Sequence, residues 1–205
     1  MRIGILTDIH EDVERLREAL AALRERRAET IVMLGDVCFW GPQGARVAAA
    51  CALLAEARAI GVWGNHDLGL CCKPDPHVLS CYDAATIAYM ASLKPRLELA
   101  GCLFSHIEPW LDARDPDQLW HFEGVPKTPA KAARSFAAAP QRIIILGHFH
   151  EWFAVTPSET LEWFGIETLV LRPDQRYLIG VDAVCRGWCA LLDTDAASIE
   201  PIALG

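Results

Sequence analysis

The sequence predicts an α/β fold that contains two β-sheets. Three short apolar runs, at 2–6, 30–34 and 59–63, alternate with helical segments at 12–27 and 45–57, and this alternation favours a parallel sheet. Each run ends in polar residues, at the edge where open α/β sheets bind their ligands. Beyond residue 150, short β-like segments separated by turn residues predict a second, largely antiparallel sheet.

The individual elements follow from their apolar patterns. RIGIL at 2–6 is a run typical of a buried strand, and apolar residues at helical spacing, with charges on the other face, predict an amphipathic helix over 12–27. Periodicity also predicts helices at 83–93 and 131–138 and strands at 97–104 and 142–146. The β-like segments that follow are 152–155, 161–164, 168–171, 177–181, 188–192 and 199–204.

Composition limits the kinds of protein that this chain can be. Its 205 residues, 52% apolar and 22% charged, predict a single globular domain over 1–205. The net charge of −8 argues against binding long nucleic acid through a basic surface. It does not exclude a small phosphate-bearing substrate, because a bound metal would reverse the local charge.

The sequence also carries expectations about location. No apolar run reaches the roughly 18 residues of a membrane helix, and MRIGILTDIH is too short and too acidic for a signal peptide. We therefore expect a cytoplasmic protein with no membrane partner. Its eight cysteines then predict reduced thiols. A cysteine-based metal site at Cys71 and Cys72, or at Cys185 and Cys189, is the less favoured interpretation, because no further pair completes a zinc set.

Polar residues gather where the predicted strands end. The motifs are Asp8-x-His10, Gly35-Asp36, Gly64-Asn65-His66-Asp67, His106 and Gly147-His148-Phe149-His150, and they hold five of the seven histidines. Mixed carboxylate, imidazole and amide ligands suit metals such as Mn, Fe or Zn. Seven such ligands are too many for one tetrahedral ion but suit two ions that share a bridging carboxylate.

Spacing within the motifs supports this interpretation. In extended backbone, residues i and i+2 point the same way, so we expect Asp8 and His10 to reach one ion, and His148 and His150 to reach one cluster. Glycines in these motifs allow sharp turns and close approach. Each motif alone has a simpler explanation as a helix cap, a turn or a core histidine. Together, in this order and each after a predicted strand, the motifs favour a metal site.

The ordered set D-x-H, G-D, G-N-H-D, H and G-H-x-H resembles the calcineurin-like metallophosphoesterase superfamily, and RYLIGVDAVCRGWCALLD resembles the closing strands of its small bacterial members. The resemblance implies a two-sheet β-sandwich flanked by helices, in four α/β/β/α layers. It also implies two divalent transition-metal ions at the sheet edges, with Mn favoured and Fe, Zn, Ni and Co as alternatives.

Residue roles carried over from the resemblance are specific. Asp8, His10 and His150 would bind the first ion. Asn65, His106 and His148 would bind the second, and Asp36 would bridge the two. His66 would be the acid or phosphate-contacting histidine, with Asp67 as its orienting partner. The chain departs from many relatives where Ile107 follows His106 in place of glycine, and where Ile-Gly-Val-Asp at 179–182 replaces Asn-Pro-Gly-Ser.

The resemblance implies a hydrolase of phosphoester bonds, with a phosphodiesterase that uses a metal-bridging hydroxide as the favoured reading. The alternatives are a phosphomonoesterase, a nucleotide pyrophosphohydrolase and, less favoured, a non-catalytic scaffold. We expect a small, nucleotide-like phosphoester as the partner and leave a homo-oligomer open. The Pro-rich segment 107–129 is predicted to be a loop over the site, where Trp110 and Trp120 either stack on a nucleobase or pin the loop to the core.

Overall fold

The computed structural model describes residues 1–39 and 44–205, and within them eleven strands form two sheets. One sheet has the order β3-β2-β1-β10-β11-β8 and the other β4-β5-β6-β9-β7. The first sheet consists of β1 (Arg2–Leu6), β2 (Thr30–Leu34), β3 (Ile60–Val62), β8 (Leu169–Val170), β10 (Trp188–Asp193) and β11 (Ser198–Ala203). The second consists of β4 (Leu97–Leu99), β5 (Cys102–Ser105), β6 (Ile143–Leu146), β7 (Phe153–Val155) and β9 (Tyr177–Gly180).

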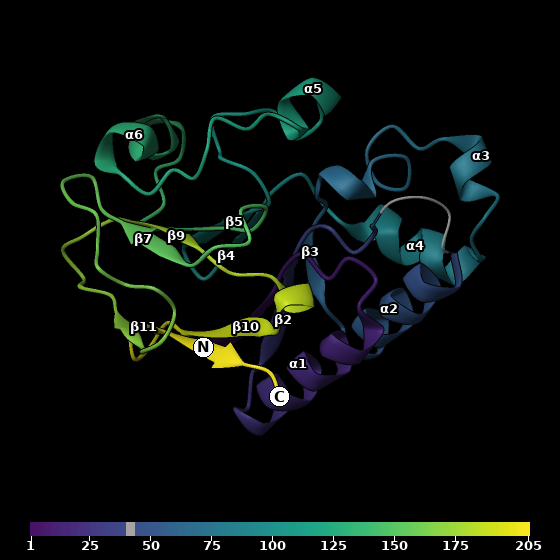
Figure 1. Ribbon diagram of the computed structural model, residues 1–205, viewed down its shortest axis with the longest axis horizontal. Coiled ribbons are helices and arrows are strands. Elements are labelled where there is room, and N and C mark those ends of the chain that lie inside the picture. Colours follow the sequence, from purple (N-terminus) through teal and green to yellow (C-terminus); the bar gives the residue numbers. More distant parts are fainter. Residues whose placement is uncertain (40–43) are drawn as a thin grey trace.

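Helices cover the outer faces of both sheets. The helices of the described residues are α1 (Val13–Glu25), α2 (Gly44–Glu56), α3 (Pro76–Leu79), α4 (Ala84–Ser92), α5 (Pro116–Leu119) and α6 (Pro129–Ala138), with single 3₁₀ turns η1 (Asn65–Asp67) and η2 (Val184–Arg186). Figure 1 shows α1 below the first sheet, α2 and α4 to its right and α6 above the second sheet. The predicted two-sheet sandwich flanked by helices is thus confirmed. In the described parts of the chain, no helix is long and apolar enough to cross a membrane.

Three layers of apolar side chains hold the sandwich together. Alternation along β6 shows how one strand serves two of them: Ile143 and Ile145 pack between the sheets, whereas Ile144 and Leu146 pack against Phe136 of α6. The third layer lies between the first sheet and the helices α1 and α2. A strand buried on both faces needs a continuous apolar sequence, which explains why IIIL has no polar position.

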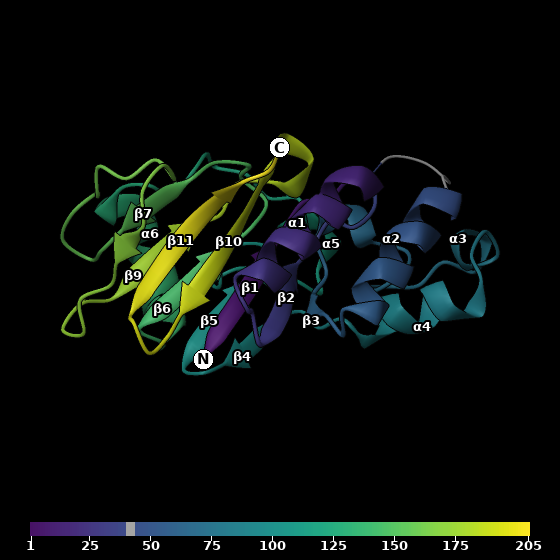
Figure 2. The ribbon, with the colours of Figure 1, turned by 90° about the horizontal axis from the view of Figure 1, so that it is seen from below.

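Parallel pairing brings the ends of several strands to one edge of the molecule. β1, β2 and β3 are mutually parallel in the first sheet, and β5, β6 and β9 are parallel in the second. The carboxyl ends of each set therefore lie together. The view in Figure 2 shows how β10, from the far end of the chain, lies beside β1, with β11 on the other side of β10.

The prediction of a second, largely antiparallel sheet made from the C-terminal segments is wrong. The second sheet is mixed, with a parallel centre, and three late strands instead complete the first sheet. The predicted strand at 161–164 is not a strand in the structure. The predicted strand at 97–104 is a hairpin, because Ala100 and Gly101 have positive φ angles and turn the chain between β4 and β5.

Candidate metal centre

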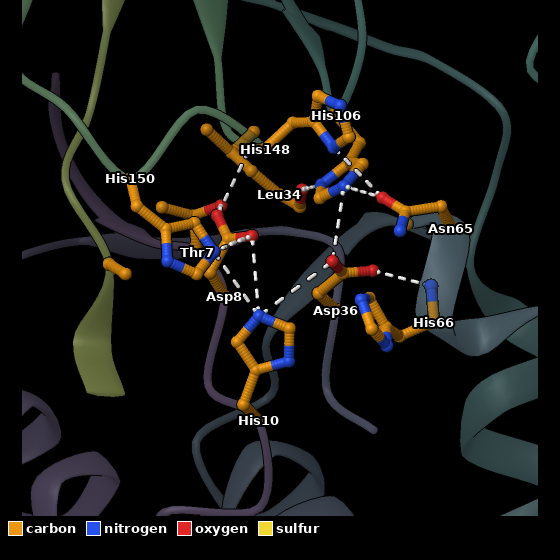
Figure 3. A network of polar contacts seen from close by, with 12 residues as sticks. Thr7, Asp8, His10, Leu34, Asp36, Asn65, His66, His106, His148 and His150 are labelled. Atoms are coloured by element: carbon orange, nitrogen blue, oxygen red, sulfur yellow. Dashed lines mark hydrogen bonds and ion pairs between the residues drawn. The ribbon is translucent and has the colours of Figure 1, made fainter. Parts of the chain in front are cut away.

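The seven predicted metal ligands and His66 come together where the carboxyl ends of both sheets meet (Figure 3). The loop after β1 carries Asp8 and His10, and the loop after β2 carries Asp36. Asn65 and His66 stand on η1, directly after β3. From the second sheet, His106 follows β5, and the loop after β6 carries the last pair, His148 and His150.

Most of these ligands sit in left-handed backbone. The φ angles of Asp8, His10, Asp36, His148 and His150 are 50°, 46°, 59°, 69° and 49°. The two members of each predicted ligand pair do lie together. The expected reason, an extended backbone in which residues i and i+2 point to the same side, is wrong. A non-glycine residue in this region costs about 1–3 kcal/mol and persists where its surroundings hold it. Here, for example, the backbone N–H of His10 donates to the Asp36 carbonyl at 3.0 Å.

Glycine is required where the loops touch. A Cβ on Gly64 would lie 2.0 Å from Asp36 Oδ1, and one on Gly147 would lie 2.1 Å from Thr7 Oγ1. Both distances are far inside van der Waals contact, so any side chain would push the loops apart. The close approach expected for these glycines is therefore a steric need of the site.

Asp8, His10 and His150 form the first group of predicted ligands. His150 Nε2 lies 3.0 Å from Asp8 Oδ1 and 3.2 Å from His10 Nε2. His10 Nδ1 lies 3.0 Å from the Cys38 carbonyl, to which it donates, so the lone pair of Nε2 faces the site. Although burial acts in the opposite direction, the hydrogen bond from His150 helps to hold the pKa of Asp8 well below its usual range. Asp8 is thus a carboxylate at neutral pH.

Asn65, His106 and His148 form the second group. Asn65 Oδ1 lies 2.9 Å from both His106 Nε2 and His148 Nδ1. His106 Nδ1 donates to the Leu34 carbonyl at 2.7 Å. Burial opposes protonation of His106, but the adjacent Asp36 carboxylate prevails and raises its pKa to about 9. Burial, together with the charge of His106, lowers the pKa of His148 to about 4.

Asp36 lies between the two groups. Its Oδ2 is 3.4 Å from His106 Nε2 and 3.9 Å from His10 Nε2, while its Oδ1 accepts the backbone N–H of His66 at 2.9 Å. One carboxylate oxygen thus faces a histidine from each group. This is the position that the predicted bridging ligand would need.

The donor atoms fit divalent cations. His10 and His106 each donate a hydrogen bond to a carbonyl through Nδ1, so Nε2 of each ring carries a lone pair. These lone pairs face the acceptor atoms of the site. The two repel each other unless a proton or a cation lies between them. Two sets of ligand atoms, from Asp8, Asp36 and His106 and from His10, Asp36 and His66, each lie within 4.8 Å of one another. Carboxylate and imidazole in this proportion suit transition metals.

Asp67 ties the loops together through their backbone. Its carboxylate is fully buried and accepts N–H groups from Asp36 at 2.8 Å, Gly64 at 2.9 Å and Cys38 at 3.1 Å. Burial and the nearby Asp36 raise the pKa of Asp67 to about 6, against the effect of the N–H donors. These contacts act on His66 through the turn that the two residues share. The role of Asp67 as a partner of the His66 side chain stays a prediction.

Replacing Asp67 by Ala is expected to destabilise the protein strongly. Three buried N–H groups would lose their acceptor, and each such group costs about 1–3 kcal/mol. A loss of roughly 3 kcal/mol or more would lower the melting temperature by about 6–12 °C at this chain length. Calorimetry on the metal-free protein measures this effect, and Asp67→Asn, which keeps one acceptor oxygen, should fall between wild type and Asp67→Ala. An unchanged melting temperature in Asp67→Ala would contradict the assignment.

Aromatic side chains line the approach to the ligands. A cavity of about 490 Å³ is bounded by Phe39 and Trp120 as well as by His10, His66, His148 and His150. The His66 ring centroid lies 4.9 Å from that of Trp120 and 6.1 Å from that of Phe39. Trp110, by contrast, lies under the Arg134 guanidinium at 3.7 Å and holds the 107–129 segment to the protein. Trp110 thus pins the loop, one of the two roles left open by the sequence, whereas stacking of Trp120 on a nucleobase stays a prediction.

Two contacts in the site were not expected. Thr7 donates its hydroxyl hydrogen to Asp8 Oδ2, and Cys185 on η2 lines the same cavity as His10 and His150. Thr7 directly precedes a ligand, and its hydroxyl was the available signal. Cys185 lies 35 positions beyond His150, and its spacing to Cys189 indicates a cysteine pair, not a place beside the histidines.

Comparisons with known proteins agree with this geometry. The model of the calcineurin-like phosphoesterase superfamily domain matches residues 1–170. A metallophosphoesterase from Sphaerobacter thermophilus is 22% identical, with a TM-score of 0.77 over 100% of this chain and 88% of its own. A novel archaeal phosphodiesterase is 16% identical, with a TM-score of 0.56 over 100% of both chains.

More distant comparisons point the same way. A dimetal phosphatase from Danio rerio is 10% identical, with a TM-score of 0.52 over 100% of this chain and 98% of its own. A search of curated proteins found no significant match. At these identities the solved structures establish the fold, whereas the family model covers most of the chain. The chain belongs to the calcineurin-like phosphoesterase superfamily.

Proposed function

We propose that this protein is a two-metal phosphodiesterase for small substrates. The observation that carries the proposal is the placement of Asp36, with one carboxylate oxygen facing His10 and His106, between two groups of metal-ligating side chains. The archaeal phosphodiesterase and the Danio rerio dimetal phosphatase, which share the fold, are consistent with it. The experiments below test the metals, the bond cleaved and the role of single residues.

Each residue group has a defined task in this proposal. Asp8, His10 and His150 would hold one ion, and Asn65, His106 and His148 the other. When bound, the ions would neutralise charge on the phosphoryl group and lower the pKa of water towards neutrality. His66 stands at the cavity wall, where its imidazole can give a proton to the departing oxygen. Burial lowers the pKa of His66 although Asp36 opposes this, which makes its protonated form a stronger acid.

The charge of the cavity favours a diester. Among the described residues that line it there is no Arg or Lys, and Asp12 adds a carboxylate to the wall. A monoester dianion would depend wholly on the metals for neutralisation of its two negative charges. A diester carries a single negative charge and therefore needs less charge neutralisation.

An apolar recess beside the cavity indicates where an ester substituent would lie. This recess, of about 570 Å³, shares Phe39, Asn65, His66 and Trp120 with the cavity. Its further walls include Leu68, Leu70, Val78 and Tyr82. A flat, partly apolar group such as a nucleobase would find stacking partners at its mouth. The proposal therefore includes nucleotide-like diesters.

A nucleotide pyrophosphohydrolase is the second candidate. Lys73 lines the recess and is a cation that a second phosphate could contact. A substrate with two linked phosphates would then place one at the metal ligands and the other near Lys73. The diester remains the better candidate, because Lys73 lines the recess and not the cavity that holds the ligands.

The substrate preference can be measured directly. Protein stripped of metal and reloaded with Mn²⁺ is expected to hydrolyse bis(p-nitrophenyl) phosphate with a kcat/KM about tenfold or more above that for p-nitrophenyl phosphate, a difference of about 1.4 kcal/mol in transition-state stabilisation. A nucleoside diphosphate ester is assayed in parallel. The control is the same preparation kept in chelator, which should be inactive.

Each alternative has its own outcome. A monoester rate far above the diester rate would replace the proposal by a phosphomonoesterase. A rate on the diphosphate ester above both would favour the pyrophosphohydrolase. Tight metal binding without turnover of any of the three would favour a non-catalytic scaffold.

A further inference from the structure

Cys185 stands against the first group of predicted ligands, apart from Cys189, the residue with which the sequence paired it as a less favoured metal site. One ligand atom each from Cys185, His10 and His150 lies within 4.8 Å of the other two. All three side chains line the cavity that also contains Asp36 and His66. Sulfur, two imidazole nitrogens and the nearby Asp8 carboxylate are together a donor set that Zn²⁺ accepts.

The backbone holds Cys185 in this place. Its own N–H donates to the Asp8 carbonyl at 3.2 Å, and the N–H of Val184 donates to the Thr7 carbonyl at 2.9 Å. On the other side, Arg186 Nη1 donates to the His150 carbonyl at 2.7 Å. The turn η2 is thus bonded to both loops that supply the first group of ligands, and Cys185 lies at its centre. A thiol fixed in this way needs little ordering to bind a cation.

We infer that Cys185 Sγ is an additional ligand of the ion held by Asp8, His10 and His150. The inference rests on the two-metal site proposed above. As the sulfur–metal bond forms, the thiol loses its proton to solvent. Thiolate is a soft ligand, so this position would favour Zn²⁺, Co²⁺ or Fe²⁺ over Mn²⁺, whereas the ligands Asn65, His106 and His148 carry no such bias.

The other described cysteines do not share this setting. Cys189 is fully buried on β10 within the core, and Cys81 is exposed near α3.

Without a cation, burial and the Asp8 carboxylate raise the pKa of Cys185 to about 11. A bound cation reverses that electrostatic effect, because a coordinating thiol is deprotonated outright.

Cobalt substitution tests the inference with a readout other than activity. The metal-free protein is loaded with two equivalents of Co²⁺ under anaerobic conditions and its absorption spectrum recorded. Ligation of Co²⁺ by thiolate gives intense near-ultraviolet charge-transfer absorption, whereas imidazole and carboxylate ligands give weak visible bands. Wild type is expected to show both. Cys185→Ser should lose the near-ultraviolet band and keep the visible ones, and the matched control Cys81→Ser should keep both.

The outcomes separate this inference from the function on which it rests. Visible bands in the wild type without the near-ultraviolet band would overturn the role of Cys185 and leave the two-metal site standing. Absence of bound cobalt from every variant would overturn both. A band that persists in Cys185→Ser would assign the thiolate elsewhere and also reject the inference.

A second measurement needs no variant. Iodoacetamide labelling of the wild type, quantified by mass spectrometry of its peptides, compares Cys185 with Cys81 before and after loading with Zn²⁺. Labelling of Cys185 relative to Cys81 is expected to fall about tenfold or more, and an unchanged ratio would contradict ligation.

A third measurement uses Cys185→Ser in competition between Zn²⁺ and Mn²⁺. Loss of the thiolate should reduce the preference for Zn²⁺ by at least about 10–100-fold, the effect that even an outer-shell partner of a ligand has on metal affinity.

Discussion

Replacing Asp36 by Asn is expected to reduce kcat/KM for a diester by about 10³-fold or more. The amide removes the negative charge that the two ions would share. Those ions would contribute several kcal/mol of charge stabilisation in the transition state. A loss of about 4 kcal/mol corresponds to that factor. Because the Asp36 carboxylate faces His10 and His106 at 3.9 and 3.4 Å, the substitution affects both ligand groups at once.

Metal content per chain measures the cause of this loss. Elemental analysis should show fewer ions bound to Asp36→Asn than to the wild type at equal free metal concentration. Asp83→Asn is the matched control, since it removes the same charge from an exposed helix cap and Asn caps a helix as well as Asp does. Activity within tenfold of the wild type, with both ions retained, would reject Asp36 as the bridging ligand.

The second large effect is expected at His66, and it should depend on the leaving group. For a diester with an alkoxide leaving group, His66→Ala should reduce kcat by about 10²–10⁴-fold, the range that general acid catalysis contributes. For a p-nitrophenolate leaving group, which departs without a proton, the loss should be much smaller. The difference between the two substrates isolates proton donation from binding.

Control experiments for His66 separate it from the metal ligands. His66 has a ring nitrogen within 4.8 Å of ligand atoms of His10 and Asp36, so metal content must be measured in the same variant. Unchanged metal content with the leaving-group dependence supports the acid role. An equal loss on both substrates would instead make His66 a phosphate-binding residue. His121→Ala removes a histidine outside the predicted set, which pairs with Glu123 at 3.1 Å, and should leave the rates unchanged.

Much of the site was predictable because most of its polar residues directly follow predicted strands. Polar residues directly after apolar runs, such as Asp8 and Asp36, are conspicuous in a sequence, and parallel strands bring their carboxyl ends to one edge. What the pattern lacks is backbone conformation. Asp8 and His150 have positive φ angles, and although Asp and His enter the left-handed region more often than most residues, it is uncommon even for them, so residue type alone does not predict it.

The strand pairing in the second half of the chain was harder to predict, because it also depends on contacts between distant residues. Strand β6 shows its burial by four consecutive apolar residues, but β9, its parallel neighbour, lies more than 30 positions further along the chain. Short strands such as β8 carry too few residues to reveal which sheet they join. Pairing between distant segments depends on the whole core, which local periodicity does not describe.

Roles that rest on contacts with the backbone were equally hidden. The sequence predicts Asp67 as a partner of the His66 side chain, and the structure adds that its oxygens accept amide hydrogens from Asp36, Gly64 and Cys38. The position of Cys185 depends on hydrogen bonds to Thr7 and Asp8, nearly 180 positions earlier. Such contacts appear when the fold is known, and they leave no spacing rule in the sequence.

The chain order of the ligands has a consequence for biosynthesis. Asp8, His10 and Asp36 leave the ribosome long before His148 and His150, and β10, which lies beside β1, follows later still. At translation rates of about 5–20 residues per second, this delay lasts several seconds or more. During that time the nascent polypeptide lacks two of the seven predicted ligands. Tight binding of the ions proposed above would therefore wait until translation is nearly complete.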